Sequence, residues 1–469
     1  MPPRRASLPA ARCVASHAGD RVDGMVNKRE RAIAELYAED PQRADRLVFG
    51  RTSGATRRGF VTGLAAMSAA VGAPIPFARQ MPRGLMPLAL AQDAEPDPLP
   101  SGQRRLSFPG KDGGLVLLRD YPLVAETPEH LLDDDTTPTA KFFVRNNGAI
   151  PDAVADADAW KLTIDGEVNR PLEIALGELK RRGRAKTLRM VLECAGNGRA
   201  FFAPRTAGEQ FTNGGAGCAE WTGIALVDLL RTAGLKSSAV YTAHYGADLG
   251  RPSDATAVAL SRGVPIKKAM DPASMLVWAM NGAPLESIHG APLRLVIPGW
   301  PGSVSHKWLN RITVRDREYD GPDMVGLAYR VPIKPMVPGG KADAGNFKIL
   351  EAMPMRVIVT SPANGTRYPA GTRELRLRGA AWAGEVEVQR VDISLDFGAT
   401  WQRTLLARAR NRYDWRRWSG SAHVPADGYY ELWVRASDAT GRMQPHIAGG
   451  WNPQGYGANP MHRIAVFIG

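Results

Sequence analysis

The stretch RMVLECAGNGRAFF, residues 189–202, places a cysteine where a buried strand is predicted to end. Such a strand end can present a side chain to a bound group, and Gly196 and Gly198 would let backbone amides approach an anion closely. Arg199 adds a fixed positive charge, which is expected to lower the pKa of the Cys194 thiol and favour thiolate. Thiolate is the soft donor that many metals bind. The alternative interpretation is a buried cysteine that packs as a small hydrophobe.

Other common metal and nucleotide motifs are missing from the sequence. Three cysteines, Cys13, Cys194 and Cys218, are too few for a disulfide framework, and no Cys-x-x-Cys or Cys-x-x-Cys-His occurs. The eight histidines include no His-x-x-x-His pair, which argues against a zinc protease site. No GxGxxG, GxxxxGK[ST] or GxSxG motif is present, so dinucleotide, P-loop and hydrolase readings have no support.

The net charge of +13 is concentrated at the N-terminus. Residues 1–91 hold 14 Lys/Arg and 7 Asp/Glu, which leaves the remaining chain at about +6, an ordinary value for solubility. Nucleic acid is therefore not indicated as a partner. An apolar fraction of 44% and a length of 469 residues allow two or three domains, each with its own core.

Residues 1–91 have the layout of a twin-arginine (Tat) export leader. Arg57-Arg58 precede a weakly apolar run rich in Ala and Gly, and Ala89-Leu90-Ala91 is a plausible cleavage site. A membrane anchor is disfavoured because the run is short and holds Pro74 and Pro76. This route carries folded proteins, so we expect a cofactor in the body of the protein and a periplasmic or secreted location without a membrane anchor. Met25 is an alternative start.

Behind the leader, the sequence predicts an α+β protein. Residues 92–137 are rich in Pro and Asp and predict a loop-rich segment, and 138–330 mix short strands and helices without a repeating βα rhythm. Within that region GIALVDLLRTAGL, residues 223–235, predicts a helix that stops at Gly234, and Asn281-Gly282 predicts a hairpin turn.

The C-terminal part has a different pattern. Residues 331–348 are dense in Pro and Gly and predict a linker. From 349 to 469, short alternating runs separated by Gly, Asn and Asp turns predict an all-β, immunoglobulin-like sandwich domain. The alternation slips between Val388 and Val391, which indicates a β-bulge.

Several segments, in order along the chain, resemble the sulfite oxidase family of molybdenum enzymes. ECAGNGRA resembles the cysteine motif of that family, and KFFVRNNGAIPD, AEWTGIALVDLL, HGAPLRLVIPG and SHKWLNRI resemble further segments of it. The tail, with FGATWQRT, YDWRRW and WNPQGYGANPMHRI, is similar to the family's dimerisation domain. The resemblance implies a molybdopterin-binding catalytic domain at 138–330 and a homodimer formed through 349–469.

The resemblance also implies roles for individual residues. Cys194 would be the molybdenum ligand beside the pterin dithiolene, and Cys194, Arg145, Arg199 and Tyr329 would be the catalytic residues around a small anionic sulfur substrate. The residues implied for cofactor binding are Phe143, Arg145, Asn146, Asn147, Cys194, Asp248, His289, Arg294, Ser305, His306 and Lys307. Trp221 matches the tryptophan that precedes a helix in the family, whereas Cys218 is expected to pack in the core without a role in the site.

Two points stay open at the level of sequence. Several sulfite-oxidising members have histidine where this chain has Asn147, which cannot relay a proton by titrating, and this weakens the inference of sulfite more than that of the cofactor. Vertebrate-like members contribute a further arginine from the second domain. Here Arg412, Arg416 and Arg417 are all candidates.

The function implied by the resemblance is oxidation of sulfite to sulfate in the periplasm. No cytochrome b5-type His-Pro-Gly-Gly, c-type haem, flavin or nicotinamide motif occurs, so electrons are expected to pass to an external acceptor such as a c-type cytochrome. Three alternatives remain: a related enzyme acting on sulfane sulfur, one acting on methionine sulfoxide, and a metal-free binding protein of the same fold.

Overall fold

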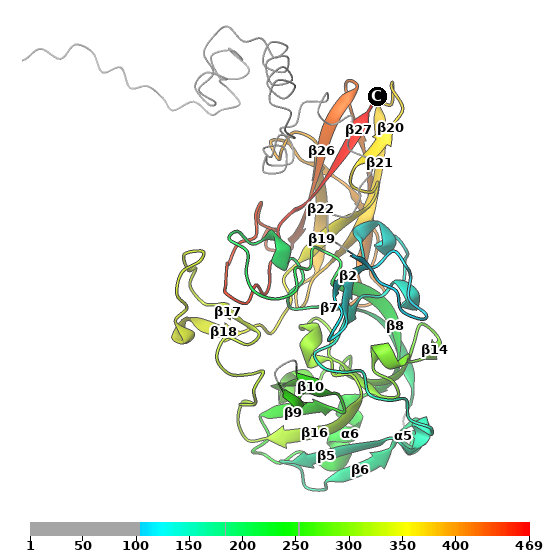
Figure 1. Ribbon diagram of the computed structural model, residues 1–469, viewed down its shortest axis with the longest axis vertical. Helices are drawn as coiled ribbons and strands as arrows, with labels where there is room; N and C mark the ends of the chain where they lie inside the picture. Colours follow the sequence, from blue (N-terminus) through cyan, green and yellow to red (C-terminus); the bar gives the residue numbers. More distant parts are fainter. Residues whose placement is uncertain (1–103, 183, 252–253) are drawn as a thin grey trace, which may run out of the picture. The chain divides into compact units, whose positions relative to one another are not determined.

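The computed structural model describes residues 104–182, 184–251 and 254–469 (Figure 1). The predicted leader, residues 1–91, and the first part of the predicted loop-rich segment lie outside these residues. The described chain is mostly sheet with few helices, and none of those helices has the length and apolar character to span a bilayer. Its α-helices are α5 (Leu176–Arg182), α6 (Leu226–Ala233) and α7 (Ile266–Ala269). Its 3-10 helices are η2 (Glu129–Leu132), η3 (Thr139–Lys141), η4 (Ala157–Ala159), η5 (Arg199–Phe201), η6 (Ser287–His289), η7 (Gly302–Val304) and η8 (Ala344–Asn346).

A small antiparallel sheet begins the described chain, where a loop-rich segment was predicted. Its strands, in the order β1-β2-β3-β4, are β1 (Arg104–Arg105), β2 (Val116–Arg119), β3 (Val124–Glu126) and β4 (Val144–Arg145). The prediction missed these strands because they are short and separated by Pro- and Asp-rich turns. The sheet carries arginines at the ends of β2 and β4: Arg145 lines the cavity described below, and Arg119 pairs with Glu209, which lines it.

The next sheet is mixed and has one face covered by helices. Its strands, in the order β12-β9-β16-β5-β6, are β12 (Ser261–Pro265), β9 (Tyr241–Gly246), β16 (Leu309–Arg315), β5 (Lys161–Gly166) and β6 (Leu172–Ala175). Figure 1 shows β9, β16, β5 and β6 in a row with α5 and α6 against them. Leucines of both helices join the apolar core of this sheet. The predicted helix stop at Gly234 is confirmed (φ 70°), but Ile224 belongs to the preceding strand.

A second sheet carries the cysteine motif at the end of one strand. Its strands are β14 (Ala283–Pro284), β13 (Met275–Met280), β8 (Ala216–Ala225), β7 (Lys186–Glu193) and β15 (Arg294–Val296), the last paired with β13. The predicted hairpin between β13 and β14 is confirmed, because Asn281 (φ 53°) and Gly282 (φ 80°) both have the positive φ of its tight turn. A separate hairpin pairs β10 (Leu249–Arg251) with β11 (Asp254–Val258).

The C-terminal part consists of two sheets that share one apolar core. One contains β19 (Arg356–Ser361), β21 (Glu374–Trp382), β25 (Arg416–His423) and β24 (Leu405–Leu406). The other contains β20 (Thr366–Tyr368), β27 (His462–Ile468), β26 (Gly428–Asp438), β22 (Val388–Ser394) and β23 (Gln402–Arg403). Both sheets contribute buried side chains to the same cluster, as in a sandwich. The predicted bulge is confirmed by a register shift between Val388 and Arg390.

The predicted linker contains short structure at both ends. β17 (Arg330–Pro332) pairs antiparallel with β18 (Phe347–Ile349), so the chain enters and leaves the Pro- and Gly-rich stretch at neighbouring positions. The linker prediction missed this pairing because each strand is three residues long.

A buried ion pair joins the first strand of the C-terminal part to the end of β7. Arg356 is fully buried, and its Nε donates to Glu193 Oε1 at 2.7 Å. The same carboxylate accepts from Trp382 Nε1 at 2.8 Å and from Asn197 Nδ2 at 2.9 Å. The other guanidinium nitrogens donate to Asn213 Oδ1 and to backbone carbonyls. The buried carboxylate of Glu193, directly before the cysteine, is therefore compensated by a buried cation and by further donors.

We predict that Arg356→Met lowers the free energy of unfolding by about 3–5 kcal/mol, because it leaves the Glu193 carboxylate buried without a cation. Urea unfolding followed by circular dichroism measures this change. Adding Glu193→Gln should recover part of the loss.

The control is Arg373→Met, which removes an exposed arginine that pairs with Asp427 and should cost about 1 kcal/mol or less. If Arg356→Met cost no more than this control, the buried pair would not hold these two segments together.

Candidate active site

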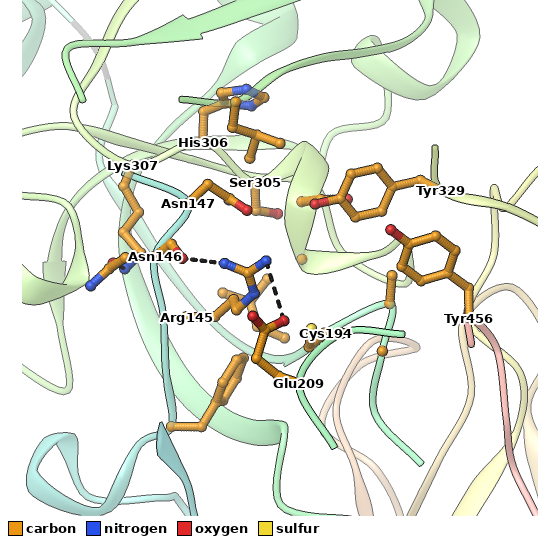
Figure 2. A pocket seen from close by; sticks show the side chains of 18 of the residues that line it. Arg145, Asn146, Asn147, Cys194, Glu209, Ser305, His306, Lys307, Tyr329 and Tyr456 are labelled. Atoms are coloured by element: carbon orange, nitrogen blue, oxygen red, sulfur yellow. Dashed lines mark hydrogen bonds and ion pairs between the residues drawn. The ribbon is translucent and has the colours of Figure 1, made fainter. Parts of the chain in front are cut away.

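The residues that the sequence assigned to catalysis and cofactor binding all lie around one cavity of about 260 Å³. Its volume is near the lower end of the roughly 300–1,000 Å³ typical of small-molecule sites. Figure 2 shows side chains that line this cavity, among them Cys194, Arg145 and Tyr329. The assigned residues in its wall are Phe143, Arg145, Asn146, Asn147, Cys194, Arg199, Asp248, His289, Arg294, Ser305, His306, Lys307 and Tyr329.

Cys194 is positioned by the backbone that follows β7. Its N–H donates to the Gly215 carbonyl at 2.8 Å, and its own carbonyl accepts from Asn197 N at 2.9 Å, which closes a tight turn. The Asn197 side chain binds both Glu193 and the Gly215 N–H, so the turn and the neighbouring loop are fixed together. The sulfur atom therefore sits in the cavity wall on a rigid support.

The glycines of the motif allow close packing around Arg199, and the Gly196 N–H also interacts with the Cys194 thiol, where it opposes the rise in the pKa of that thiol. A Cβ at Gly196 would lie 2.6 Å from the Arg199 guanidinium, so that side chain occupies the space above the glycine. Gly198 has φ 85°, and a Cβ there would meet the Ala458 carbonyl at 2.6 Å. A Cβ at Gly455, in the C-terminal part, would lie 2.6 Å from Arg199 Cγ. The arginine is thus enclosed by backbone on two sides.

Arg145 and Arg199, named here the arginine pair, approach the cavity from different elements. Arg145 ends β4, and Arg199 begins η5. Arg199 Nε donates to the Gln454 carbonyl at 3.0 Å and Nη1 to the Glu209 carbonyl at 2.9 Å. The Glu209 carboxylate lies 3.8 Å from Arg145 Nη2 and 3.9 Å from Arg199 Nη1 (Figure 2). The pair can offer forked donors to a small oxyanion.

The pKa of the Cys194 thiol differs from the sequence prediction. Burial raises this pKa, while Arg145 and Arg199 oppose the rise without overcoming it. The prediction was wrong in sign because it counted the nearby charge and not the loss of water around the sulfur. A bound metal ion would reverse the balance, since a coordinating thiol is deprotonated.

The part of the cavity wall formed by Arg294 and Lys307, named here the cation-lined recess, could bind an anionic group. Arg294 is 5% exposed and donates to the carbonyls of His289 and Ser305, and burial lowers its pKa to about 9. Burial also lowers the pKa of Lys307 well below its usual value. Among the described residues Arg294 Nε has no hydrogen-bond partner, whereas Lys307 Nζ donates to Asn146 Oδ1 and to the Ile288 carbonyl. A buried arginine with an open donor, with a lysine in the same wall, fits the phosphate of a pterin cofactor.

Other polar groups in the cavity wall also fit a heteroatom-rich ligand. The buried Asn146 Nδ2, Ser303 Oγ and both ring nitrogens of His306 lack partners within the described structure. Burial lowers the pKa of His306 to about 4 and that of His289 well below its usual value, so both are neutral hydrogen-bonding groups near pH 7. Burial raises the pKa of Asp248 to about 6, although Lys307 opposes the rise.

No cluster of three or more His, Cys, Asp or Glu side chains suited to a metal ion occurs in the described ranges. A metal held by Cys194 would therefore need further donors from an organic cofactor. Cys194 and the cation-lined recess belong to the same cavity wall and could contact different parts of such a cofactor.

The second-domain residues at the cavity differ from those the sequence proposed. Arg412 binds Glu385, Arg416 binds backbone carbonyls and Arg417 binds Asp133, and none of the three lines the cavity. Gln454 and Tyr456 line it instead. The candidate arginines lie on or beside β25, whereas the residues that reach the cavity come from the loop that precedes β27.

Tyr456 forms an aromatic wall with Tyr329. Their rings stack at 5.0 Å with an interplanar angle of 15°, and both side chains point in the direction of Arg145 (Figure 2). The buried Arg262 guanidinium lies over the Tyr329 ring at 4.3 Å. Burial raises the pKa of Tyr329 far above neutral, so its hydroxyl keeps its proton.

Sequence reasoning missed Glu209, Gln454 and Tyr456. Glu209 follows a glycine in a segment without secondary structure, and no local pattern marks it. The other two lie in WNPQGYGANP, whose closely spaced glycines and aromatic residues could have indicated a loop held against a site.

Two family descriptions match the chain. Residues 147–323 match the oxidoreductase molybdopterin binding domain, and residues 347–468 match the Mo-co oxidoreductase dimerisation domain. The fold and these matches define an oxidoreductase with a molybdopterin-binding domain.

Curated relatives cover most of the chain. It is 31% identical to mitochondrial sulfite oxidase of Rattus norvegicus over 396 residues, which is 80% of this chain and 70% of the relative. It is 33% identical to the Homo sapiens enzyme over 77% of this chain and 67% of the relative. The solved sulfane dehydrogenase SoxCD from Paracoccus pantotrophus is similar with a TM-score of 0.63 and 27% identity, over 83% of this chain and 96% of that chain. The chain belongs to the sulfite oxidase family.

We predict that Arg294→Met lowers the pterin and molybdenum content of the purified protein at least about tenfold, because it removes a buried cation and its open donor from the recess. Metal analysis and pterin fluorescence measure the change.

The control is Arg311→Met, which removes an exposed arginine on β16 that pairs with Asp165 and should leave the cofactor content unchanged. A normal pterin content in a folded Arg294→Met protein would contradict the assignment of the recess.

Proposed function

We propose that this protein oxidises sulfite to sulfate at a molybdenum cofactor bound in the cavity, with Cys194 as the protein ligand of the metal. The observation that carries the proposal is that the Cys194 sulfur and the arginine pair line the same cavity as the cation-lined recess. Membership of a family with sulfite oxidases among its relatives supports the same reaction.

The cofactor would be held by several groups of the cavity wall. Arg294 and Lys307 would bind its phosphate, and Asn146, Ser303 and His306 would hydrogen-bond its heteroatoms through groups that lack protein partners or face the recess. When bound, a molybdenum-pterin cofactor supplies two-electron redox chemistry coupled to oxygen-atom transfer. The protein's contribution is binding, orientation and charge.

The arginine pair would bind and orient the substrate oxyanion next to Cys194. Two forked, permanently charged donors stabilise the oxygen atoms as negative charge moves from sulfur to oxygen. Tyr329 retains its proton because burial raises its pKa, so its hydroxyl can donate to the same oxygens. The stacked rings of Tyr329 and Tyr456 would limit the entry of water from that side. Asn147, which lines the cavity, can hydrogen-bond but cannot relay a proton by titrating.

The cellular setting belongs to the same proposal. The leader at residues 1–91 would direct export by the twin-arginine route to the periplasm, and electrons would pass one at a time to an external acceptor such as a c-type cytochrome. The match of residues 347–468 to a dimerisation domain supports a homodimer. In this proposal the catalytic domain spans 138–330 and an immunoglobulin-like dimerisation domain spans 349–469.

A second candidate substrate is sulfane sulfur carried by a partner. The similar solved structure is that of a sulfane dehydrogenase, and this chain matches 96% of it. The replacement of a titratable group by Asn147 also leaves room for a substrate other than sulfite. Methionine sulfoxide reduction and a metal-free binding function remain weaker alternatives, because nothing at the cavity favours them.

The test compares substrates on the purified, cofactor-loaded protein. We expect sulfite to drive cytochrome c reduction, and Cys194→Ser to lower that rate about 1,000-fold or more because the metal loses its protein donor. Protein-bound sulfane sulfur with the same acceptor, and methionine sulfoxide with a viologen donor, are assayed in parallel.

The matched control is Cys218→Ser. Cys218 is buried beside Asp414 and away from the cavity wall, so its replacement should leave the rate per bound molybdenum within about twofold. Normal sulfite turnover by Cys194→Ser with a full metal content would overturn the assignment of the ligand, and faster turnover of sulfane sulfur would move the proposal to the second candidate.

A further inference from the structure

A carboxylate lies within the group of arginines that would bind the substrate. Glu209 lines the cavity with its side chain 11% exposed, and burial alone would raise its pKa. Arg145, a hydrogen bond from the Glu209 backbone N–H, Arg119 and Arg199 together outweigh burial and hold the pKa below its usual value, so Glu209 is ionised near pH 7. It therefore places a negative charge where the proposed substrate is itself an anion.

The three arginines do not hold Glu209 equally. Arg119 Nη1 lies 2.8 Å from Glu209 Oε1, whereas Arg145 and Arg199 are 3.8 Å and 3.9 Å from the other carboxylate oxygen. Arg119 ends β2, does not line the cavity and has a side chain that is 36% exposed. Its Nε also donates to the Pro122 carbonyl at 3.3 Å. The shortest ion pair of Glu209 is therefore with an arginine outside the cavity, although Arg145 has the larger effect on its pKa.

This geometry puts Glu209 and an incoming oxyanion in competition for the same donors. Two like charges about 4 Å apart repel strongly where water screens them poorly. An anion bound by Arg145 and Arg199 would gain from any movement of the carboxylate toward Arg119. Arg199 would stay in place during that movement, because the Gln454 and Glu209 backbone carbonyls bind it independently of the Glu209 side chain.

We propose that Glu209 sets the anion affinity of the site by competing with the substrate for the arginine pair, and that Arg119 tunes this competition by holding the carboxylate at the cavity edge. The identity of the substrate anion rests on the proposed function. Glu209, held at the cavity edge by Arg119, thus weakens the binding of doubly charged oxyanions, including the product sulfate, and favours their release.

The experiment measures sulfate binding to the oxidised, cofactor-loaded protein by titration calorimetry, because sulfate binds without turnover. Glu209→Gln keeps the size and hydrogen-bonding capacity of the side chain and removes its charge. We expect it to tighten sulfate binding at least about tenfold and to lower KM for sulfite by a similar factor, with kcat unchanged or reduced by slower product release.

Arg119→Gln should act in the opposite direction. Without the Arg119 contact, the Glu209 carboxylate would interact more strongly with Arg145 and Arg199 and compete more with the anion. We expect it to weaken sulfate binding by about tenfold in the parent protein and to have little effect once Glu209→Gln is present. That dependence distinguishes action through Glu209 from a simple loss of positive charge near the cavity. Glu173→Gln, which removes an exposed carboxylate paired with Lys161, is the charge control and should change nothing.

Unchanged or weaker sulfate binding by a cofactor-loaded Glu209→Gln protein would overturn the proposal, as would an Arg119→Gln effect that persists in the double variant. These results are independent of turnover. Tighter sulfate binding by Glu209→Gln in a protein that does not oxidise sulfite would uphold the role of Glu209 while rejecting the proposed reaction. If Glu209→Gln oxidised sulfite and its sulfate affinity were unaltered, the proposed reaction would be upheld and the role of Glu209 rejected.

Discussion

The arrangement of the cavity depends on the buried ion pair between Arg356 and Glu193. An ionised carboxylate without water is tolerated only when a cation and hydrogen-bond donors surround it, and here Arg356, Trp382 and Asn197 supply them. Because Glu193 is the last residue of β7, these contacts fix the position from which Cys194 enters the cavity. Arg356 begins β19, so the contact that fixes the cysteine comes from the C-terminal part of the chain.

The same part of the chain completes the cavity wall. The loop before β27 places Gln454 and Tyr456 at the cavity, and the Gln454 carbonyl binds Arg199. A domain matched to dimerisation thus also shapes the site at which substrate would bind. The cavity wall contains two different groups of cations: the cation-lined recess, suited to a pterin phosphate, and the arginine pair, which lies near the Glu209 carboxylate.

Short-range sequence patterns predicted much of this structure. The strand before Cys194, the helix stop at Gly234 and the Asn281-Gly282 hairpin depend on local backbone preferences, and the structure confirms them. The resemblance, carried by ordered motifs, brought together residues that all line one cavity. The resemblance could not predict contacts that depend on tertiary packing. These include which second-domain side chains reach the cavity and which carboxylate faces the arginines. The sign of the thiol pKa shift also depended on burial, which the motif alone does not reveal.

The central claim is that the Cys194 sulfur binds a molybdenum ion inside this cavity. A crystal structure of the purified protein, with anomalous diffraction recorded at the molybdenum absorption edge, tests it directly. The account predicts a molybdenum peak at bonding distance from Cys194 Sγ, with pterin density extending from it toward Arg294 and Lys307. A pterin-loaded crystal whose molybdenum peak lies away from Cys194 would contradict it.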